Sequence, residues 1–352
     1  MVCYKLNGKG VVKMKKSMKR LMCGTLAAGF LFLASCGGNS SATTTPAPAS
    51  SGQPQSASPA GNQVYSLVTA SLGGTYYIVG SGLAEVINQN VDGITVNNVV
   101  SQGSTGNAIK VGTGESELGI TNYYAGIRAI DGVAPFEQSY DIMGICTLQY
   151  SIIQFNSLAN QNITKMTDLK GKRVSIGPAG GGGALIFEEI LPYWDMKMDD
   201  MNVSYMSYAD GGEALTDGRI DVNVPHGAPP LEAISTVAVT NPINIISMEP
   251  EVLEKISEDL PYYDAAVIPG GTYAGLDEDI TSLGVQDILV CRSDMDEETV
   301  YQITKAIYEH LEYLHSIHAS LAGMDFEGYK DSLVPLHPGA KRFYEEKGLK
   351  LD

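Results

Sequence analysis

The chain has 352 residues, of which 44% are apolar and 18% are charged, so it can bury a sizeable core and has room for about two domains. Its 23 basic and 40 acidic side chains give a formal net charge of −17. This charge argues against a nucleic-acid-binding protein, because phosphate recognition needs clustered Lys and Arg. The 39 glycines exceed the usual share of about 7%, and we expect them at turns and at close backbone approaches.

Residues 1–35 have the features of a secretory leader. They contain seven of the 23 basic residues and no acidic residue, and residues 21–34 form an uncharged apolar run too short to span a bilayer comfortably. The run ends in Leu-Ala-Ser-Cys at Cys36, which resembles the bacterial lipobox, in which the cysteine carries the lipid. We therefore predict a lipoprotein signal peptide over 1–35 and lipidation of Cys36. The alternatives are an ordinary signal with an accidental cysteine and a buried N-terminal helix.

The following segment, 36–63, is predicted to be a disordered tether. From Gly37 to Gln63 it has no charged residue and consists of Ser, Thr, Ala, Pro, Gly, Asn and Gln. Such a composition cannot build a core, and as a flexible coil it reaches on the order of 30 Å. We expect an extracytoplasmic protein held to the bacterial cell membrane by its N-terminal lipid.

The body alternates between apolar, β-branched runs and segments with helical periodicity. The expected elements are strand 64–70, helix 76–90, strand 94–100, helix 108–111, strand 118–121, helix 123–130, a long apolar stretch 142–155, strand 172–176, helix 184–194, strand 203–206, helix 212–217, strand 220–224, helix 231–237, strand 243–248, helix 296–318 and a final helix after residue 340. This alternation predicts an α/β protein with parallel sheets and a ligand site beyond the carboxyl ends of the strands.

Two segments are expected to cross between two lobes: residues 142–155 and the segment near residues 243–248. Lobe one then comprises residues 64–150 and 249–352, including the C-terminal helices, and lobe two comprises residues 151–248.

The carboxyl ends of the predicted strands share small, polar, glycine-rich loops. These loops are Ser71–Thr75, Ser101–Asn107, Thr121–Tyr123 and Gly177–Ala184. Because helix N-termini expose backbone N–H groups and a partial positive charge, several of them around one crevice favour an anion such as a carboxylate or a phosphate. The alternative for each loop is an ordinary helix cap or turn. His226 follows a strand end at the same crevice and is either a ligand contact or a turn residue.

Motifs for catalysis or for metal binding are missing from the sequence. It has no Gly-x-Ser-x-Gly, no His-Glu-x-x-His, and no Lys-Ser/Thr after its glycine loop. His310, His315 and His318 do not share one helix face. We expect no enzyme, no cofactor and no metal. Cys146 and Cys291 lie in apolar runs and are expected to be buried free thiols, with a disulfide as the alternative.

Several pieces in order resemble the TAXI branch of solute-binding proteins of tripartite ATP-independent periplasmic (TRAP) transporters. The pieces are Gly73-Gly74-Thr75-Tyr76-Tyr77 with Gly80, Gly103-Ser104 with Asn107, the run from Asp168 to Pro178, Asp217-Gly218-Arg219-Ile220-Asp221, Pro269-Gly270-Gly271-Thr272-Tyr273, and Leu336-His337-Pro338-Gly339-Ala340 with Tyr344-Glu345 and Gly348-Leu349. The resemblance implies a two-lobed, type II periplasmic-binding-protein-like α/β fold. Each lobe would be a mixed sheet flanked by helices, with the ligand cleft between the lobes.

The resemblance also implies a binding site. Carried over to this sequence, the resemblance places ligand binding at Gly74, Thr75, Tyr76, Ser104, Thr105, Asn107, Gly180, Gly181, Gly182, Gly183, Ala184, Pro225 and His226. The loop Thr121–Tyr123 adds Asn122 and Tyr123 to the predicted site. The family loop after Gly-Pro usually carries Ser and Thr, whereas residues 179–184 are only Ala and Gly. Anion capture there must rely on backbone N–H groups.

The function that follows is a monomeric, non-enzymatic receptor for a small organic acid, with no nucleic-acid partner. The implied ligand is glutamate-, 2-oxoglutarate- or dicarboxylate-like, and the implied partner is an ion-gradient-driven TRAP permease in the membrane. The alternatives are a binding protein of an ABC importer and a ligand-sensing subunit of a membrane signalling system.

Overall fold

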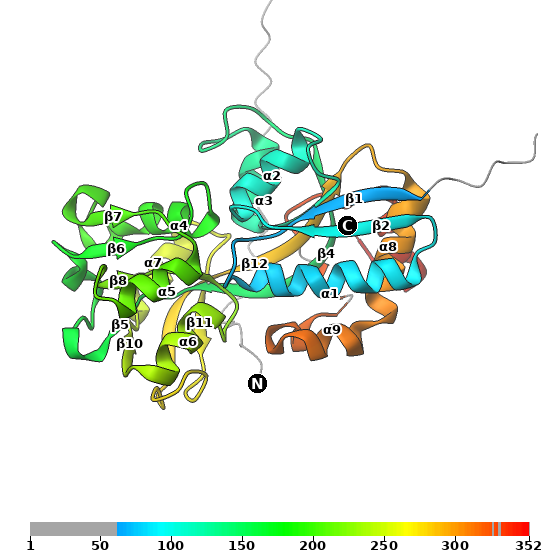
Figure 1. Ribbon diagram of the computed structural model, residues 1–352. Helices are drawn as coiled ribbons and strands as arrows, with labels where there is room; N and C mark the ends of the chain where they lie inside the picture. The colour runs from blue at the N-terminus through cyan, green and yellow to red at the C-terminus, as the bar shows by residue number, and fades with distance from the viewer. Residues whose placement is uncertain (1–61, 326, 330–331, 352) are drawn as a thin grey trace, which may run out of the picture. The chain divides into compact units, whose positions relative to one another are not determined.

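The computed structural model describes residues 62–325, 327–329 and 332–351 (Figure 1). The predicted signal peptide over 1–35, the predicted lipid site at Cys36 and the predicted tether up to residue 61 lie outside the described residues. Gln63, expected to end the tether, is instead the first residue of strand β1.

The described residues fold into one seven-stranded and one five-stranded sheet with flanking helices, which confirms the predicted α/β class. The first sheet has the order β2-β1-β3-β12-β4-β9, with β11 paired to β12, and the second has the order β10-β5-β8-β6-β7. The strands of the first sheet are β1 (Gln63–Val68), β2 (Ile94–Val99), β3 (Leu118–Asn122), β4 (Ile142–Ile153), β9 (His226–Gly227), β11 (Asp264–Ile268) and β12 (Ile280–Arg292). Those of the second are β5 (Asn156–Leu158), β6 (Arg173–Ser175), β7 (Asn202–Ser204), β8 (Val222–Asn223) and β10 (Ile243–Ile245).

The α-helices lie where helices were predicted, except α7 (Pro250–Asp259), for which no helix was expected. They are α1 (Thr75–Asn90), α2 (Ser104–Gly112), α3 (Tyr123–Asp131), α4 (Gly182–Ile190), α5 (Tyr208–Thr216), α6 (Glu232–Thr240), α7 (Pro250–Asp259), α8 (Glu297–Glu309), α9 (Leu311–Ile317) and α10 (Pro338–Glu346). The single helix expected over 296–318 is wrong, because His310 leaves helical geometry (φ −121°, ψ 28°) and separates α8 from α9. Helix α2 begins four residues earlier than expected, at Ser104.

Strand β12 departs from the parallel sheets that the alternation alone predicts and agrees with the mixed sheets that the resemblance implies. β1 is parallel to β2 and β3, and β6 is parallel to β7 and β8, as predicted. β12, however, lies antiparallel between β3 and β4. Only its apolar end, near Cys291, stands out in the sequence, because polar residues such as Ser282 and Asp287 interrupt the rest. The first sheet is therefore mixed.

Three apolar clusters hold these layers together. One joins α1, α8 and α10 to a face of the first sheet, a second includes side chains from α2, α3, α4 and α7, and a third joins α5 and α6 to β10 and β11. Figure 1 places α1 and α2 on different sides of β1 and β2. Cys146 and Cys291 are buried free thiols, as expected.

The long strands β4 and β12 of the first sheet extend to the residues that pack beside the second sheet. Residues 280–284 of β12 pair with β11, whereas residues 287–291 pair with β3. Ile268 of β11 and Ile280 of β12 pack in the same cluster as Ile234 of α6, beside the second sheet. The lobe boundaries given above stay a prediction, and this packing favours a second crossing within β12 rather than near residues 243–248.

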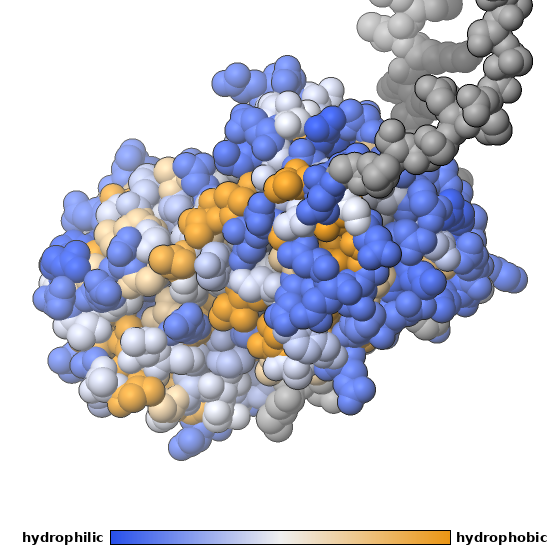
Figure 2. All heavy atoms as spheres, turned by 45° about the vertical axis from the view of Figure 1, so that its right-hand side comes forward, coloured by the Kyte–Doolittle hydropathy of each residue, from blue (hydrophilic) through white to orange (hydrophobic). Residues whose placement is uncertain are grey.

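Hydrophilic residues cover most of the face drawn in Figure 2, and apolar residues lie between them in separate groups. Among the described residues, none of the helices has the length and apolar character needed to cross a membrane.

Candidate ligand-binding site

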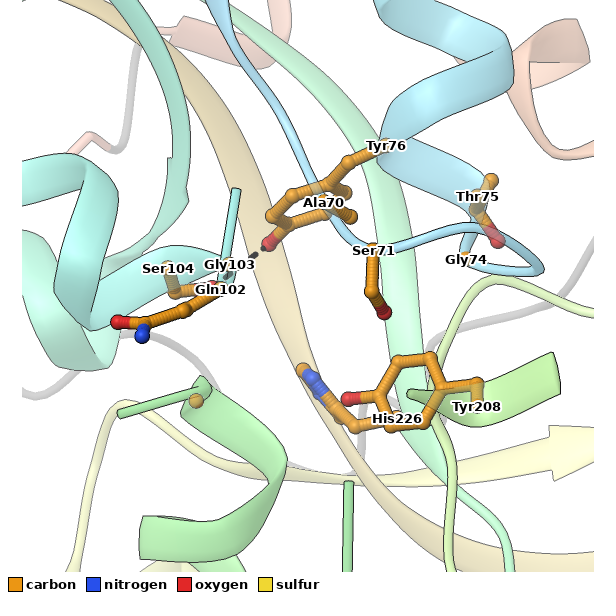
Figure 3. A pocket seen from close by; sticks show the side chains of 11 residues that line it. Ala70, Ser71, Gly74, Thr75, Tyr76, Gln102, Gly103, Ser104, Tyr208 and His226 are labelled. Carbon is orange, nitrogen blue, oxygen red and sulfur yellow. Dashed lines mark hydrogen bonds between the residues drawn. The ribbon is translucent and has the colours of Figure 1, made fainter. Parts of the chain in front are cut away.

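A small cavity lies where α1, α2 and α4 begin (Figure 3). Its free volume is about 20 Å³, which is room for about one water molecule. The cavity is lined by Ala70, Ser71, Gly74, Thr75, Tyr76, Gln102, Gly103, Ser104, Gly182, Tyr208 and His226. The lining contains no Lys, Arg, Asp or Glu, so any charge on a ligand must be met by dipoles and hydrogen bonds.

The three helices that begin here share an unusual N-terminus. Their N-cap residues are Gly74, Gly103 and Gly181, and none of the three helices has a side-chain cap. In contrast, Asn122 caps α3 and Ser207 caps α5 through side-chain oxygens. The first backbone N–H groups of α1, α2 and α4 are therefore not claimed by a capping side chain, and uncapped N–H groups of this kind bind anions.

Backbone conformation explains one glycine near the cavity, and close packing explains another. Gly103 has φ +105°, a conformation that disfavours any residue with a Cβ atom. At Gly183, a Cβ atom would lie 2.8 Å from Cβ of His226 and 3.0 Å from the hydroxyl of Tyr208. The N-terminus of α4 can approach these two side chains only because residue 183 has no side chain.

One wall of the cavity carries a chain of buried hydroxyl groups that ends on an acid. The Tyr76 hydroxyl donates to Oδ1 of Asp287, and the Ser151 hydroxyl donates to Oδ2 of the same carboxyl. Ser104 Oγ lies 3.1 Å from the Tyr76 hydroxyl on the cavity side. Burial raises the pKa of Asp287 well above its ordinary value. A titratable acid therefore lies directly behind the lining, one hydrogen bond from the lining residue Tyr76.

The opposite wall is formed by Tyr208 and His226. Burial raises the pKa of Tyr208 to about 12. Burial lowers the pKa of His226 to about 4, so its ring is neutral near pH 7. Nε2 of His226 is buried without a hydrogen-bond partner. Figure 3 shows Ser71 facing these two side chains across the cavity, while the Tyr76 hydroxyl points toward Ser104.

Further buried polar atoms near the cavity also have no partner. These are Ser71 Oγ, Thr105 Oγ1 and Asn122 Nδ2. Because buried polar groups are normally hydrogen-bonded, these atoms are available to pair with a ligand.

Direct contacts join the two walls. Thr75 Oγ1 donates to the carbonyl of Ala228 at 3.0 Å, and the Gly106 N–H donates to the carbonyl of Gly180 at 3.3 Å. Farther along, Arg128 of α3 forms a 2.5 Å ion pair with Glu189 of α4. A ligand larger than a water molecule can enter only when these walls move apart.

Six of the residues predicted to bind the ligand line the cavity, and nine do not. Those that line it are Gly74, Thr75, Tyr76, Ser104, Gly182 and His226. The others are Thr105, Asn107, Asn122, Tyr123, Gly180, Gly181, Gly183, Ala184 and Pro225. Asn107 has a structural task instead, because its amide donates to the carbonyls of Thr69 and Ile120. Asn122 caps α3.

The prediction of site residues missed Ala70, Ser71, Gln102, Gly103 and Tyr208. Ser71, Gln102 and Gly103 lie in loops that the sequence had already marked as candidates. Tyr208 had a comparable signal, since it follows the strand β7 and begins a helix capped by Ser207. No group of three or more His, Cys, Asp or Glu side chains that could hold a metal occurs in the part of the chain that the structure describes.

A match to a known protein family covers most of the body. The model of the NMT1-like family matches residues 67–348. The chain belongs to the NMT1-like family. Its described residues lie almost entirely within this match, so the cavity and both of its walls are part of the family domain.

Solved structures with a similar fold are distant in sequence. PhnD1 from Prochlorococcus marinus (MIT 9301), in complex with methylphosphonate, is 10% identical with a TM-score of 0.50, over 81% of this chain and 97% of that one. A protein from Bordetella bronchiseptica RB50 is 17% identical with a TM-score of 0.50, over 80% and 82%. The alkanesulfonate-binding protein SsuA from Xanthomonas axonopodis pv. citri, bound to MOPS, is 12% identical with a TM-score of 0.44, over 82% and 85%.

The predicted fold is confirmed: this NMT1-like chain has the fold of the type II periplasmic binding proteins. The finer assignment to the TAXI branch of TRAP receptors stays a prediction.

Proposed function

We propose that this protein is an extracytoplasmic solute receptor that captures a small carboxylate between the two walls of the cavity. The observation that carries the proposal is the meeting of three helix N-termini, each with a glycine N-cap and no side-chain cap, around a lining without charged side chains. Such N-termini stabilise an anion through backbone N–H groups and helix dipoles. The similar PhnD1 structure holds methylphosphonate, which is also a small anion.

The site residues of the proposal are those that line the cavity together with the predicted residues next to it. Gly74, Thr75, Tyr76 and Ser104 would act from one wall, and Gly182, Gly183 and His226 from the other. The ligand class is a glutamate-, 2-oxoglutarate- or dicarboxylate-like acid. Binding would require the walls to part and close again by bending within β4 and β12.

For delivery we propose a TRAP-type permease driven by an ion gradient, on the strength of the sequence resemblance. A monomer tethered through a lipid on Cys36 would suit this role. The alternative partner is an ABC importer, and a third role is ligand sensing for a membrane signalling system. Transport in vesicles with the purified permease separates the first two, because only the ABC importer requires ATP.

A thermal-shift panel of amino, keto and dicarboxylic acids tests the ligand class. A ligand at 100 times its Kd adds about 2.7 kcal/mol to the free energy of unfolding, which raises the melting temperature by a few degrees for a protein of this size. Shifts with carboxylates support the proposal. Shifts with sugars or cations alone contradict it, and catalytic turnover of a bound acid contradicts the receptor role.

A further inference from the structure

Asp287 is a fully buried acid directly behind the cavity. It lies on β12 opposite Asn122 of β3, where the pairing between these two strands ends. Its side chain is fully buried. Its two oxygens accept hydrogen bonds from Tyr76 and Ser151, so the carboxyl is held from two sides. None of its atoms needs to touch the ligand for the acid to influence what the cavity binds.

The direction of the hydrogen bonds determines what Ser104 can offer. Both oxygens of Asp287 accept when this carboxyl is ionised, and Tyr76, whose hydroxyl has one hydrogen, then gives it to Asp287. The 3.1 Å contact between Tyr76 and Ser104 must then be donated by Ser104. Having given up its only hydrogen, Ser104 Oγ presents lone pairs alone to the cavity.

The opposite wall offers hydrogen-bond donors. The Tyr208 hydroxyl lines this wall, and its hydrogen can be directed toward a ligand. The N-terminus of α4, beginning at Gly182, adds backbone N–H groups on the same side. The Ser104 side chain is thus an acceptor backed by an acid, in a cavity where the backbone N–H groups at the starts of α1, α2 and α4 are donors.

We propose that ionised Asp287, acting through Tyr76, fixes the Ser104 hydroxyl as a hydrogen-bond acceptor, so that this side chain selects a ligand group that carries hydrogens, such as an ammonium. An α-amino acid is then preferred over the α-keto acid with the same skeleton. This inference rests on the proposed function and narrows its ligand class. Asp287 and Tyr76 are positioning residues in this account, and Ser104 makes the contact.

Matched acid pairs test the proposal with the full chain by calorimetric titration. The pairs are L-glutamate with 2-oxoglutarate, L-aspartate with oxaloacetate, and L-alanine with pyruvate, which differ only at the second carbon. For the pair that binds best, we expect the amino member to bind at least 10-fold more tightly, because a keto oxygen facing Ser104 leaves two acceptors without a hydrogen.

The Tyr76→Phe variant removes the relay and returns the hydroxyl hydrogen to Ser104. We expect the amino-to-keto affinity ratio to fall to about 1 or to invert. Tyr208→Phe, on the opposite wall, is the matched control: it removes one hydroxyl from the same cavity but should weaken both members equally and leave the ratio unchanged. Asp287→Asn gives a second test if Tyr76→Phe does not fold, because the Asn amide can donate a hydrogen bond to Tyr76. Tyr76 can then donate to Ser104, and the Ser104 hydroxyl hydrogen is free to point into the cavity.

Equal affinity of the wild-type protein for both members overturns the inference, and so does a ratio that Tyr76→Phe and Asp287→Asn leave unchanged. Both results leave the receptor function intact, since an acid still binds. If none of the acids binds and compounds of another class do, the proposed function fails and this inference fails with it.

Discussion

The two walls of the cavity recognise a ligand by different means. On the wall formed by α1 and α2, a side-chain relay from Ser104 through Tyr76 ends on the buried acid Asp287. On the wall formed by α4, α5 and β9, the donors are backbone N–H groups and the Tyr208 hydroxyl, and close approach depends on the absence of side chains at the glycines. The first wall adds a fixed hydrogen-bond direction to the N-termini of α1 and α2, whereas the second relies on the N-terminus of α4 and on close packing against its glycines.

This difference has a consequence for mutation. A relay of side chains can be broken one atom at a time with the shape kept, as in Tyr→Phe or Asp→Asn. A wall made of backbone cannot lose its donors by substitution and responds mainly to added atoms. The four predictions below follow from this contrast.

The largest effect is expected from Gly183→Asp in the backbone wall. The new carboxylate would stand at the N-terminus of α4, where its Cβ would already lie 2.8 Å from Cβ of His226. Repulsion of an anionic ligand in a buried site costs several kcal/mol, so affinity should fall about 1,000-fold. Calorimetric titration with the best-binding acid measures this. Glu188→Gln, at an exposed position of the same helix, should bind normally. Unchanged affinity of Gly183→Asp would remove α4 from the site.

Stability should depend on pH through His226. Its pKa is about 4 in the folded protein against an ordinary 6.5, so the unfolded chain binds more protons between these values. The free energy of unfolding is therefore unaffected by His226 above about pH 6.5, where the ring is neutral in both states. It falls by about 3 kcal/mol as the pH falls toward 4, because the unfolded chain takes up the proton first. Urea unfolding of the wild-type protein and His226→Gln across this range measures the difference. A His226→Gln variant with the same pH slope as wild type would contradict the prediction.

Asp287→Asn should show the opposite dependence on pH. The raised pKa of Asp287 means that its ionised form penalises the folded state, and this penalty grows as the pH rises above the ordinary 3.8. The variant should gain stability over wild type with rising pH, by about 1.4 kcal/mol for each unit by which the pKa is raised. Asp294→Asn is the control: Arg292 lowers the pKa of Asp294, so this variant should gain nothing at high pH. An Asp287→Asn gain confined to low pH would contradict the account.

The smallest effect concerns the contact between the walls. Thr75→Val removes the hydroxyl that donates to the carbonyl of Ala228 while keeping the side-chain shape. One neutral hydrogen bond contributes about 1 kcal/mol, so affinity should fall about fivefold through a weaker closed state. Thr75→Ser keeps the hydroxyl and should bind like wild type. Equal losses in both variants would assign the effect to packing instead.

Local signals in the sequence were sufficient for most helices and for the position of the cavity. Glycine-rich loops after the strands marked the starts of α1 and α4, because the need for uncapped N–H groups and close approach is visible as residue type. They marked α2 less well: Ser104 begins that helix, which turns Asn107 inward to the carbonyls of Thr69 and Ile120. A helix register that is off by a few residues changes which side chains reach the ligand.

The sequence by itself determined the α/β class, the buried thiols and the loops around the cavity, since these depend on hydrophobic periodicity and on residues near each other in the chain. Tertiary structure alone decided the antiparallel position of β12 and the placement of Asp287 behind Tyr76, 211 residues earlier in the chain. Long-range strand pairing leaves no local pattern, because it depends on which segments together bury the most apolar surface and satisfy their hydrogen bonds. The acid that would decide what the cavity accepts is therefore invisible until the chain is folded.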